Sequence, residues 1–211
     1  MNETQAREFI AEIGRSMFER RLTFGSSGNI SVRIDGGWLM TPTGSSLGRL
    51  DPAKLSKLDD TGKLISGDAP TKESFLHLAM YRERDKAGAV VHLHSTHSVA
   101  VSCLHGIDHD DVLPPITAYY VMRVGKLPLV PYFAPGDMAL GEAVGRLAAK
   151  HSAMLLANHG PVVAGSSLSA AVDAIEELEE TARLYLLLHG RPTRYLSPEQ
   201  IADLKRRFPP A

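Results

Sequence analysis

A mixed α/β domain is the fold class that the sequence predicts, and three observations support it. The chain has 211 residues, enough for one domain (residues 1–211) with a substantial core. Apolar residues recur at helical spacing in some segments, whereas shorter segments show the continuous or alternating apolar pattern of strands. The two kinds of segment are interspersed, with no repeat, low-complexity tract or linker between them. We therefore expect a single domain.

The composition excludes several classes of protein. Lys and Arg total 23 against 24 Asp and Glu, so no net charge favours nucleic acid or an anionic membrane. No run reaches the roughly 18 apolar residues of a membrane span, and the N-terminus has no apolar secretion segment. The single cysteine, Cys103, cannot form an intrachain disulfide and is interpreted as a small core residue. We expect a cytoplasmic protein.

The first third of the chain predicts a helix and then a hairpin. Asn2 and Gln5 form a capping box before an amphipathic helix that runs to about Arg20. Strands over 30–34 and 38–41 are joined by an Asp-Gly-Gly turn. Two loops of small residues, 24–29 and 41–46, flank this hairpin and could meet. Short strands are expected at 55–58 and 63–65.

The remainder alternates between strands and helices. Thr71 is the expected cap of a helix that carries Glu73 in its first turn. A helix from Ser169 to Leu188 follows later, with Glu179 on a solvated face and paired with Arg183. The other expected elements are strands at 89–95, 116–121, 127–132, 153–157 and 161–164, and helices at 96–104, from 136 and after the capping box at 197–200.

The strand over 89–95 carries the clearest chemical signal. His92 and His94 lie two residues apart, so their imidazoles point to one face of the strand. Two imidazoles can share a metal ion, and catalytic zinc has about three protein ligands. His97 is a local candidate for a third, but it falls in the first turn of the next helix. His77, one turn beyond Glu73, is expected to pack or to face solvent.

The small-residue loops have a possible role in binding a phosphate. Asn29, Thr43 and Gly44 supply amides and a hydroxyl without bulk. Thr71 and Lys72 add a hydroxyl, the amides of a helix N-terminus and one ammonium group. The alternative is that these residues form ordinary turns. Together with a metal ion they indicate a small phosphorylated substrate.

Taken as a set, five motifs resemble the class II aldolase/adducin family over about residues 4–190. The motifs are Gly28-Asn-Ile-Ser31, Thr41-Pro-Thr-Gly44, Glu73, His92-Leu-His-Ser95 and Asn158-His-Gly160. The resemblance implies a three-layer α/β/α sandwich with a largely antiparallel central sheet, assembled as a homotetramer with active sites at subunit interfaces. It further implies that His92, His94 and His159 bind one Zn²⁺ per subunit, and that Glu73 is the acid/base residue and an additional ligand. Asn29, Thr43, Gly44, Thr71 and Lys72 fall where the family binds its substrate phosphate.

Departures from the aldolase pattern indicate a branch of the family. Thr71-Lys72 replaces a serine pair, and the segments 43–49, 93–98 and 118–120 are most similar to 3-oxo-tetronate 4-phosphate decarboxylases. That branch releases CO₂ from a sugar-acid phosphate through a metal-stabilised enediolate and forms dihydroxyacetone phosphate. The resemblance places the proton donor at Tyr119, with Tyr120 as the alternative. A sugar-phosphate aldolase, dehydratase or epimerase, and a non-catalytic adducin-like interaction module, remain as alternative functions.

Overall fold

A single eight-stranded sheet forms the centre of the molecule in a computed structural model that describes residues 2–208. The strands lie in the order β4-β3-β2-β1-β5-β8-β7-β6, and all neighbours are antiparallel except the parallel pair β6 and β7. The strands are β1 (Asn29–Ile34), β2 (Gly37–Met40), β3 (Ser56–Asp59), β4 (Leu64–Ser66), β5 (Ala89–His92), β6 (Leu129–Val130), β7 (Ala153–Leu156) and β8 (Gly160–Gly165).

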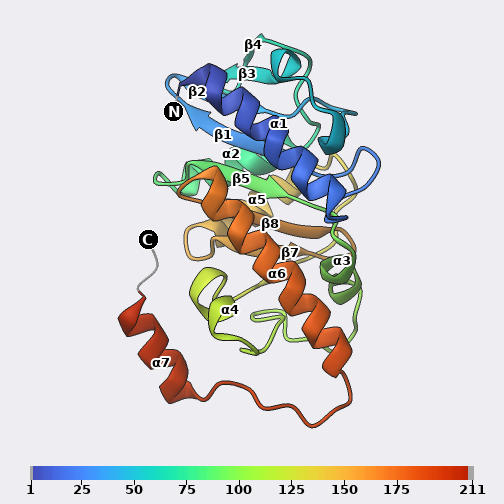
Figure 1. The fold of residues 1–211 in the computed structure, drawn as a ribbon, viewed down its shortest axis with the longest axis vertical. Coiled ribbons are helices and arrows are strands. Elements are labelled where there is room, and N and C mark those ends of the chain that lie inside the picture. The colour runs from blue at the N-terminus through green and yellow to red at the C-terminus, as the bar shows by residue number, and fades with distance from the viewer. Residues whose placement is uncertain (1, 209–211) are drawn as a thin grey trace.

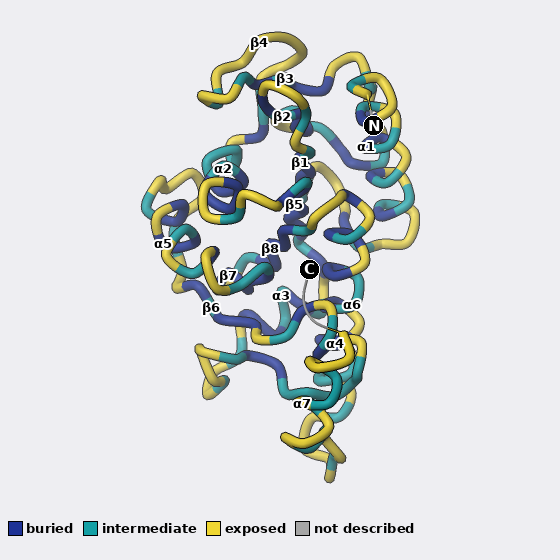
Figure 2. The backbone as a smooth tube through the Cα atoms, turned by 90° about the vertical axis from the view of Figure 1, so that its left-hand side faces the viewer, coloured by how far each residue is buried: buried dark blue, intermediate teal, exposed yellow. Residues whose placement is uncertain are grey.

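Helices cover both faces of this sheet and make a three-layer sandwich (Figure 1). The helices are α1 (Glu3–Glu19), α2 (Ser74–Glu83), α3 (Thr96–Ser102), α4 (Ala118–Arg123), α5 (Ala139–Ala148), α6 (Leu168–Leu188) and α7 (Pro198–Arg207), with short 3-10 turns η1 (Leu47–Arg49) and η2 (Pro52–Lys54). Seen along the sheet, α2 and α5 lie on one side and α1 and α6 on the other (Figure 2). This arrangement confirms the predicted α/β/α sandwich with a largely antiparallel sheet.

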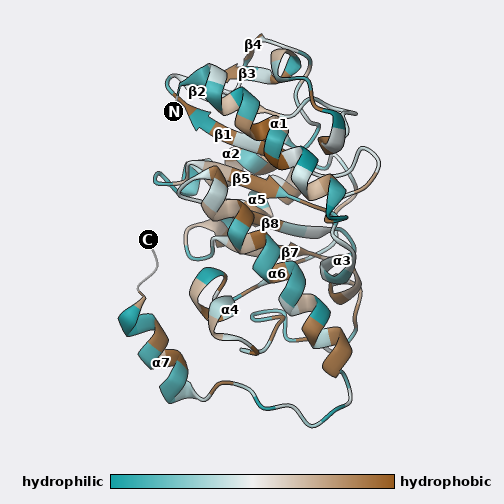
Figure 3. Cartoon of the chain, viewed as in Figure 1, coloured by the Kyte–Doolittle hydropathy of each residue, from teal (hydrophilic) through white to brown (hydrophobic). Residues whose placement is uncertain are grey.

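The burial of β5 explains why its sequence is almost entirely apolar. The strand lies between β1 and β8, and all four of its residues are buried. Ala89 and Val91 pack into the core on the α1 and α6 side, whereas Val90 packs into the core beneath α2 and α5. The apolar colour of β5 between more hydrophilic helices is visible in Figure 3. Because side chains alternate, His92 points toward the α2 side of the sheet.

Two strands predicted in the middle of the chain differ in the structure. Residues 116–121 do not form a strand, because Thr117 caps α4 and its side chain accepts a hydrogen bond from the Tyr120 backbone at 3.1 Å. Tyr and Val are typical of strands, but this local cap decides the conformation. The strand predicted at 127–132 is reduced to the two residues of β6.

Three predictions about individual side chains are wrong. Glu179 is buried instead of solvated, and it accepts hydrogen bonds from the backbones of His97 and Ser98 in α3. Arg183 consequently lies beside Glu180, at 3.4 Å, and not beside Glu179. Cys103 ends α3 at the surface and is exposed, so it is not a core residue.

The remaining elements agree with the predictions to within a few residues. Both capping boxes form, at Asn2 and at Ser197. The long helix α6 begins one residue before the predicted Ser169, because Ser167 is its cap. Across residues 2–208, no helix combines the length and the apolarity needed to cross a lipid bilayer.

Candidate metal centre

Four side chains converge at one end of β5. Glu73 is the N-cap residue of α2, His92 is the last residue of β5, His94 follows two residues later, and His159 lies in the turn between β7 and β8. One donor atom from each of them lies within 4.8 Å of all the others. The pairing of β5 with β8 and the packing of α2 over the same face bring together these segments, which are distant in the sequence.

The distances between these donor atoms fit one small divalent cation. His94 Nε2 lies 3.1 Å from His92 Nε2 and 3.1 Å from His159 Nε2. Glu73 Oε1 lies 3.1 Å from His159 Nε2, and Glu73 Oε2 lies 3.6 Å from His92 Nε2. Four ligands at about 2.0–2.1 Å from a tetrahedral zinc ion would be separated by about 3.3 Å.

The protonation state of His92 shows that its Nε2 has no hydrogen to donate to the nitrogens around it. Its Nδ1 donates to the Pro161 carbonyl oxygen at 2.8 Å, so Nε2 of the neutral ring carries only a lone pair. That lone pair faces the nitrogen of His94, which also faces that of His159. A cation can be shared by several lone pairs, whereas a single proton cannot satisfy them all. A set of three imidazoles and one carboxylate suits zinc and other divalent metals of the first transition row.

Burial and mutual proximity keep the imidazoles available as ligands. Burial lowers the pKa of His92 to about 3, because its effect exceeds the opposing effect of the Glu73 carboxylate. Burial likewise lowers the pKa of His94. Burial alone would raise the pKa of Glu73, but His92 and hydrogen bonds from His159 and Asn29 hold it well below its ordinary value. At neutral pH the ionised carboxylate of Glu73 thus faces the neutral imidazole of His92, with the likewise neutral His94 beside it, as metal binding requires.

The backbone at residues 158–160 places His159. Asn158 adopts the left-handed conformation (φ 56°), which Asn tolerates better than most residues. Gly160 has φ 150°, and a Cβ atom there would lie 2.2 Å from the Leu93 carbonyl oxygen. This close approach holds the corner against the chain between His92 and His94.

A cavity of about 780 Å³ opens above the four donors. His94, His159 and Glu73 line it, whereas His92 is fully buried. All five residues predicted to bind phosphate also line it: Asn29, Thr43, Gly44, Thr71 and Lys72. The two small-residue loops meet here as expected.

Backbone hydrogen bonds fix the wall that these phosphate candidates form. The Thr43 amide donates to the Ala69 carbonyl at 2.9 Å, and the Thr71 amide donates to the Thr41 carbonyl at 3.1 Å. Gly44 has φ 69° with open space where a Cβ would be, so its backbone faces the cavity without cover. The prediction that Thr71 is the N-cap of α2 is wrong, because Glu73 occupies that position. Thr71 Oγ1 instead accepts a hydrogen bond from the Glu73 amide.

Comparison with known families identifies the class of protein. The family model described as "Class II Aldolase and Adducin N-terminal domain" matches residues 8–186. The chain belongs to this family. The match covers most of the chain, including all four convergent donors, and confirms the resemblance that the motifs indicate.

Individual members of the class II aldolase and adducin family are similar over nearly the whole chain. A 3-oxo-tetronate 4-phosphate decarboxylase from Pectobacterium atrosepticum is 52% identical over 204 residues, which cover 96% of this chain and 94% of that protein. An L-fuculose phosphate aldolase from Escherichia coli is 35% identical over 193 residues, covering 89% and 86%. The crystal structure of YgbL from Escherichia coli superposes with a TM-score of 0.94 at 50% identity, covering 96% of this chain and 99% of that one.

Other predicted residues of this class II aldolase family member lie away from the cavity. Tyr119 is on α4, is 59% exposed and is not among the lining residues, whereas Tyr120 is 1% exposed and packs in the core. His97 turns away, as expected, and its Nδ1 lies 2.8 Å from Glu179. Among the described residues, this chain thus brings the metal and phosphate candidates together but not the tyrosine.

Sequence reasoning missed an aromatic wall of the cavity. Tyr132 and Phe133, which follow β6, line it together with Phe24. Their position depends on the parallel pairing of β6 with β7, for which the local sequence gave no signal. Ser26, Ser27 and Ser45, which lie in the two small-residue loops, also line it.

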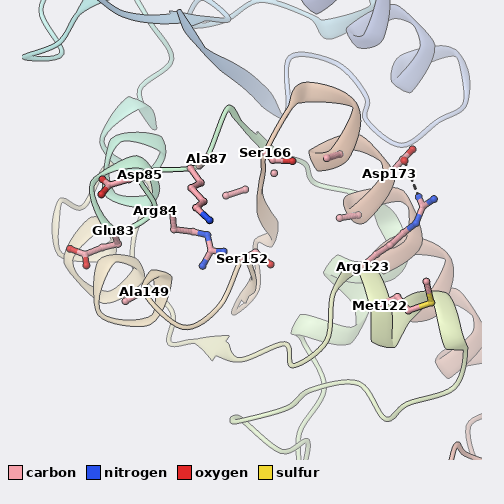
Figure 4. A pocket seen from close by; sticks show the side chains of 15 residues that line it. Glu83, Arg84, Asp85, Ala87, Met122, Arg123, Ala149, Ser152, Ser166 and Asp173 are labelled. Carbon is pink, nitrogen blue, oxygen red and sulfur yellow. Dashed lines mark ion pairs between the residues drawn. The ribbon is translucent and has the colours of Figure 1, made fainter. Parts of the chain in front are cut away.

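A second cavity of about 710 Å³ lies at the other end of β5 and β8. Figure 4 shows Arg84, Ser152 and Ser166 around it, with Arg123 paired to Asp173 at 3.2 Å. It contains none of the four convergent donors. The chemistry predicted from the sequence therefore belongs to the first cavity.

Proposed function

We propose that the protein is a cytoplasmic, homotetrameric decarboxylase with one Zn²⁺ per subunit, which converts a 3-oxo-tetronate 4-phosphate to dihydroxyacetone phosphate and CO₂. One observation carries the proposal. A set of three imidazoles and one carboxylate adjoins a cavity that is also lined by hydroxyl, amide and ammonium groups, in a chain that is 52% identical to a protein named for this reaction.

The rim of the cavity would bind the phosphate. The lining includes Gly44, Thr43, Thr71 and Lys72, which offer a backbone amide, two hydroxyls and an ammonium group. Lys72 is the one Lys or Arg side chain among the described residues that line the cavity, so it can meet either the phosphate or the carboxylate of the substrate. Asn29 donates one amide hydrogen to Glu73 and retains a second.

Loss of CO₂ from a 3-oxo acid leaves an electron pair that the neighbouring carbonyl must accept. Zinc, when bound by His92, His94 and His159, supplies the Lewis acidity that polarises this carbonyl. Glu73 is ionised and accepts a hydrogen bond from the substrate hydroxyl next to the breaking bond. The carbon that loses CO₂ then takes up one proton, so the enediolate becomes dihydroxyacetone phosphate.

Tyr119 is our candidate for the donor of that proton. Its exposed position on α4, outside the cavity of its own chain, supports a role in the site of a neighbouring subunit of the tetramer. Mixing inactive Tyr119→Phe subunits with inactive Glu73→Gln subunits, followed by reassembly, should then restore part of the activity. Mixtures that stay inactive, although mixed tetramers form, would rule out this role.

Product identification tests the reaction itself. The purified zinc-loaded protein should release equimolar CO₂ and dihydroxyacetone phosphate from one stereoisomer of a 3-oxo-tetronate 4-phosphate. The second candidate is a sugar-phosphate aldolase, because an L-fuculose phosphate aldolase is 35% identical. Release of an aldehyde from a ketose 1-phosphate, without CO₂ from the sugar-acid phosphate, would favour that candidate. A protein that binds no zinc would instead favour an interaction module.

A further inference from the structure

A buried histidine that takes no part in the proposed reaction is linked to Glu73 of the metal centre through the side chain of Asn29. His77 is on α2, one turn after Glu73, and none of its surface is exposed. Its Nδ1 lies 2.7 Å from Ser31 Oγ, and its Nε2 contacts Asn29 Oδ1. Beyond Ser31, the hydroxyl of Tyr81 lies 2.9 Å from Ser31 Oγ. At the other end, Asn29 Nδ2 donates to Glu73 Oε2 at 2.7 Å.

These contacts have one consistent direction of donation. An ionised Glu73 can only accept, so Asn29 presents its NH₂ group to Glu73 and its oxygen to His77. His77 Nε2 must therefore carry the ring proton, and its Nδ1 accepts the proton of the Ser31 hydroxyl. The Ser31 oxygen in turn accepts from Tyr81. Burial lowers the pKa of His77 to about 4, which keeps the ring in this neutral form at pH 7.

We infer that His77 is a positioning residue that holds the Asn29 amide in the orientation from which it anchors Glu73 at the metal centre. Without the Nε2–H donor, the amide could rotate and turn its oxygen toward the carboxylate of Glu73. The carboxylate would then lose a charge-assisted hydrogen bond at Oε2, while Oε1 faces His159. The inference rests on the proposed role of Glu73 as ligand and acid/base residue.

Three variants separate positioning from simple packing. His77→Phe keeps a ring in the site but removes both hydrogen bonds, whereas His77→Gln keeps an N–H that can reach Asn29. Met80→Ala removes a fully buried side chain from the same helix and leaves the hydrogen-bonded chain intact. Affinity for Co²⁺, which has a visible spectrum in such sites, is measured by competition with a chelator, alongside the thermal midpoint, kcat and KM.

His77→Phe should weaken Co²⁺ binding by about 10- to 100-fold, the usual effect of losing a group that orients a metal ligand. It should lower kcat more than it raises KM, and His77→Gln should recover part of both losses. Met80→Ala should lower the thermal midpoint, whereas its Co²⁺ affinity should stay within twofold of the native value. Equal Co²⁺ affinity in His77→Phe and Met80→Ala would overturn the inference.

A double-mutant cycle tests whether His77 acts through Asn29. In an Asn29→Ala background, His77→Phe should cause no further loss of Co²⁺ affinity. An undiminished loss in that background would contradict the inference. The metal measurements need no substrate, so they distinguish the two proposals. If the protein decarboxylates no 3-oxo-tetronate 4-phosphate but shows these Co²⁺ effects, the proposed function is refuted and the role of His77 is retained.

Discussion

Glu73 is placed so that one side chain can serve both of the proposed roles, as a metal ligand and as the acid/base residue. Its two oxygens face different neighbours: Oε1 lies near His159, and Oε2 accepts from Asn29 and lies near His92. The depressed pKa means that the carboxylate is charged whenever substrate binds near neutral pH. We therefore expect the proposed reaction to depend on the charge of Glu73 more than on the shape of its side chain.

Substitution of Glu73 and His94 should separate the two roles. Glu73→Gln keeps an oxygen at the site but loses the charge, so we expect most of the zinc to remain and turnover to fall by about 10²–10⁴-fold. His94→Ala removes a nitrogen that faces two others, so zinc and activity should be lost together. Zinc content by atomic spectroscopy and turnover are measured on the same samples.

Glu142→Gln, an exposed carboxylate on α5, is the matched control and should behave as the native protein. Equal zinc loss in Glu73→Gln and His94→Ala would show that Glu73 is chiefly a ligand.

At the scale of elements, the turn between β7 and β8 depends on its backbone more than on its side chains. Asn158 and Gly160 both have positive φ angles, and Gly160 touches the chain beside His94. The turn therefore sets how far His159 stands from His94. A change of the backbone in this turn should therefore weaken metal binding although no metal-binding side chain is replaced.

Gly160→Ala tests this dependence. The added methyl group would clash with the Leu93 carbonyl at a φ angle that disfavours Ala, so we expect a loss of roughly 1–3 kcal/mol in unfolding free energy and weaker zinc binding. Denaturant unfolding and chelator competition measure the two effects. Gly145→Ala, in the interior of α5 with open space around it, should be neutral or slightly stabilising. Unchanged zinc affinity in Gly160→Ala would refute the dependence.

Elements with strong local signals could be predicted from the sequence, and those that depend on distant contacts could not. The capping boxes and the alternation of His92 with His94 were predicted, because a few neighbouring residues determine them. Glu179 was misplaced because its partners, His97 and Ser98, lie about 80 residues away. α4 was missed because the single cap at Thr117 outweighs the strand preference of its aromatic residues.

For the whole molecule, burial of neutral histidines makes stability depend on pH. His77 has a folded-state pKa of about 4, against about 6.5 for an exposed histidine. As pH falls below 6.5, the unfolded chain takes up a proton that the folded chain excludes, so the unfolding free energy falls until pH reaches about 4. His92, with a pKa of about 3, acts in the same direction.

The metal-free protein should therefore lose stability between pH 6.5 and 4. At about 1.4 kcal/mol for each pH unit, His77 alone accounts for a loss of up to roughly 3 kcal/mol across that window. Urea denaturation at pH 7.5, 6 and 5 and at fixed protein concentration measures it. His77→Phe should show a shallower decline with falling pH, whereas Met80→Ala should keep the native slope. Parallel declines in all three proteins would exclude His77 as a source of the acid sensitivity.

The separation of the metal donors along the chain has a kinetic consequence. His92 and His159 approach only when β5 has paired with β8, and Glu73 joins them only when α2 packs on the sheet. Such long-range contacts are expected to form late in folding. A bound ion would therefore stabilise the native state more than the transition state, so it should slow unfolding and leave the folding rate nearly unchanged. In a cell with little available metal, the protein would fold at the same rate but unfold more often.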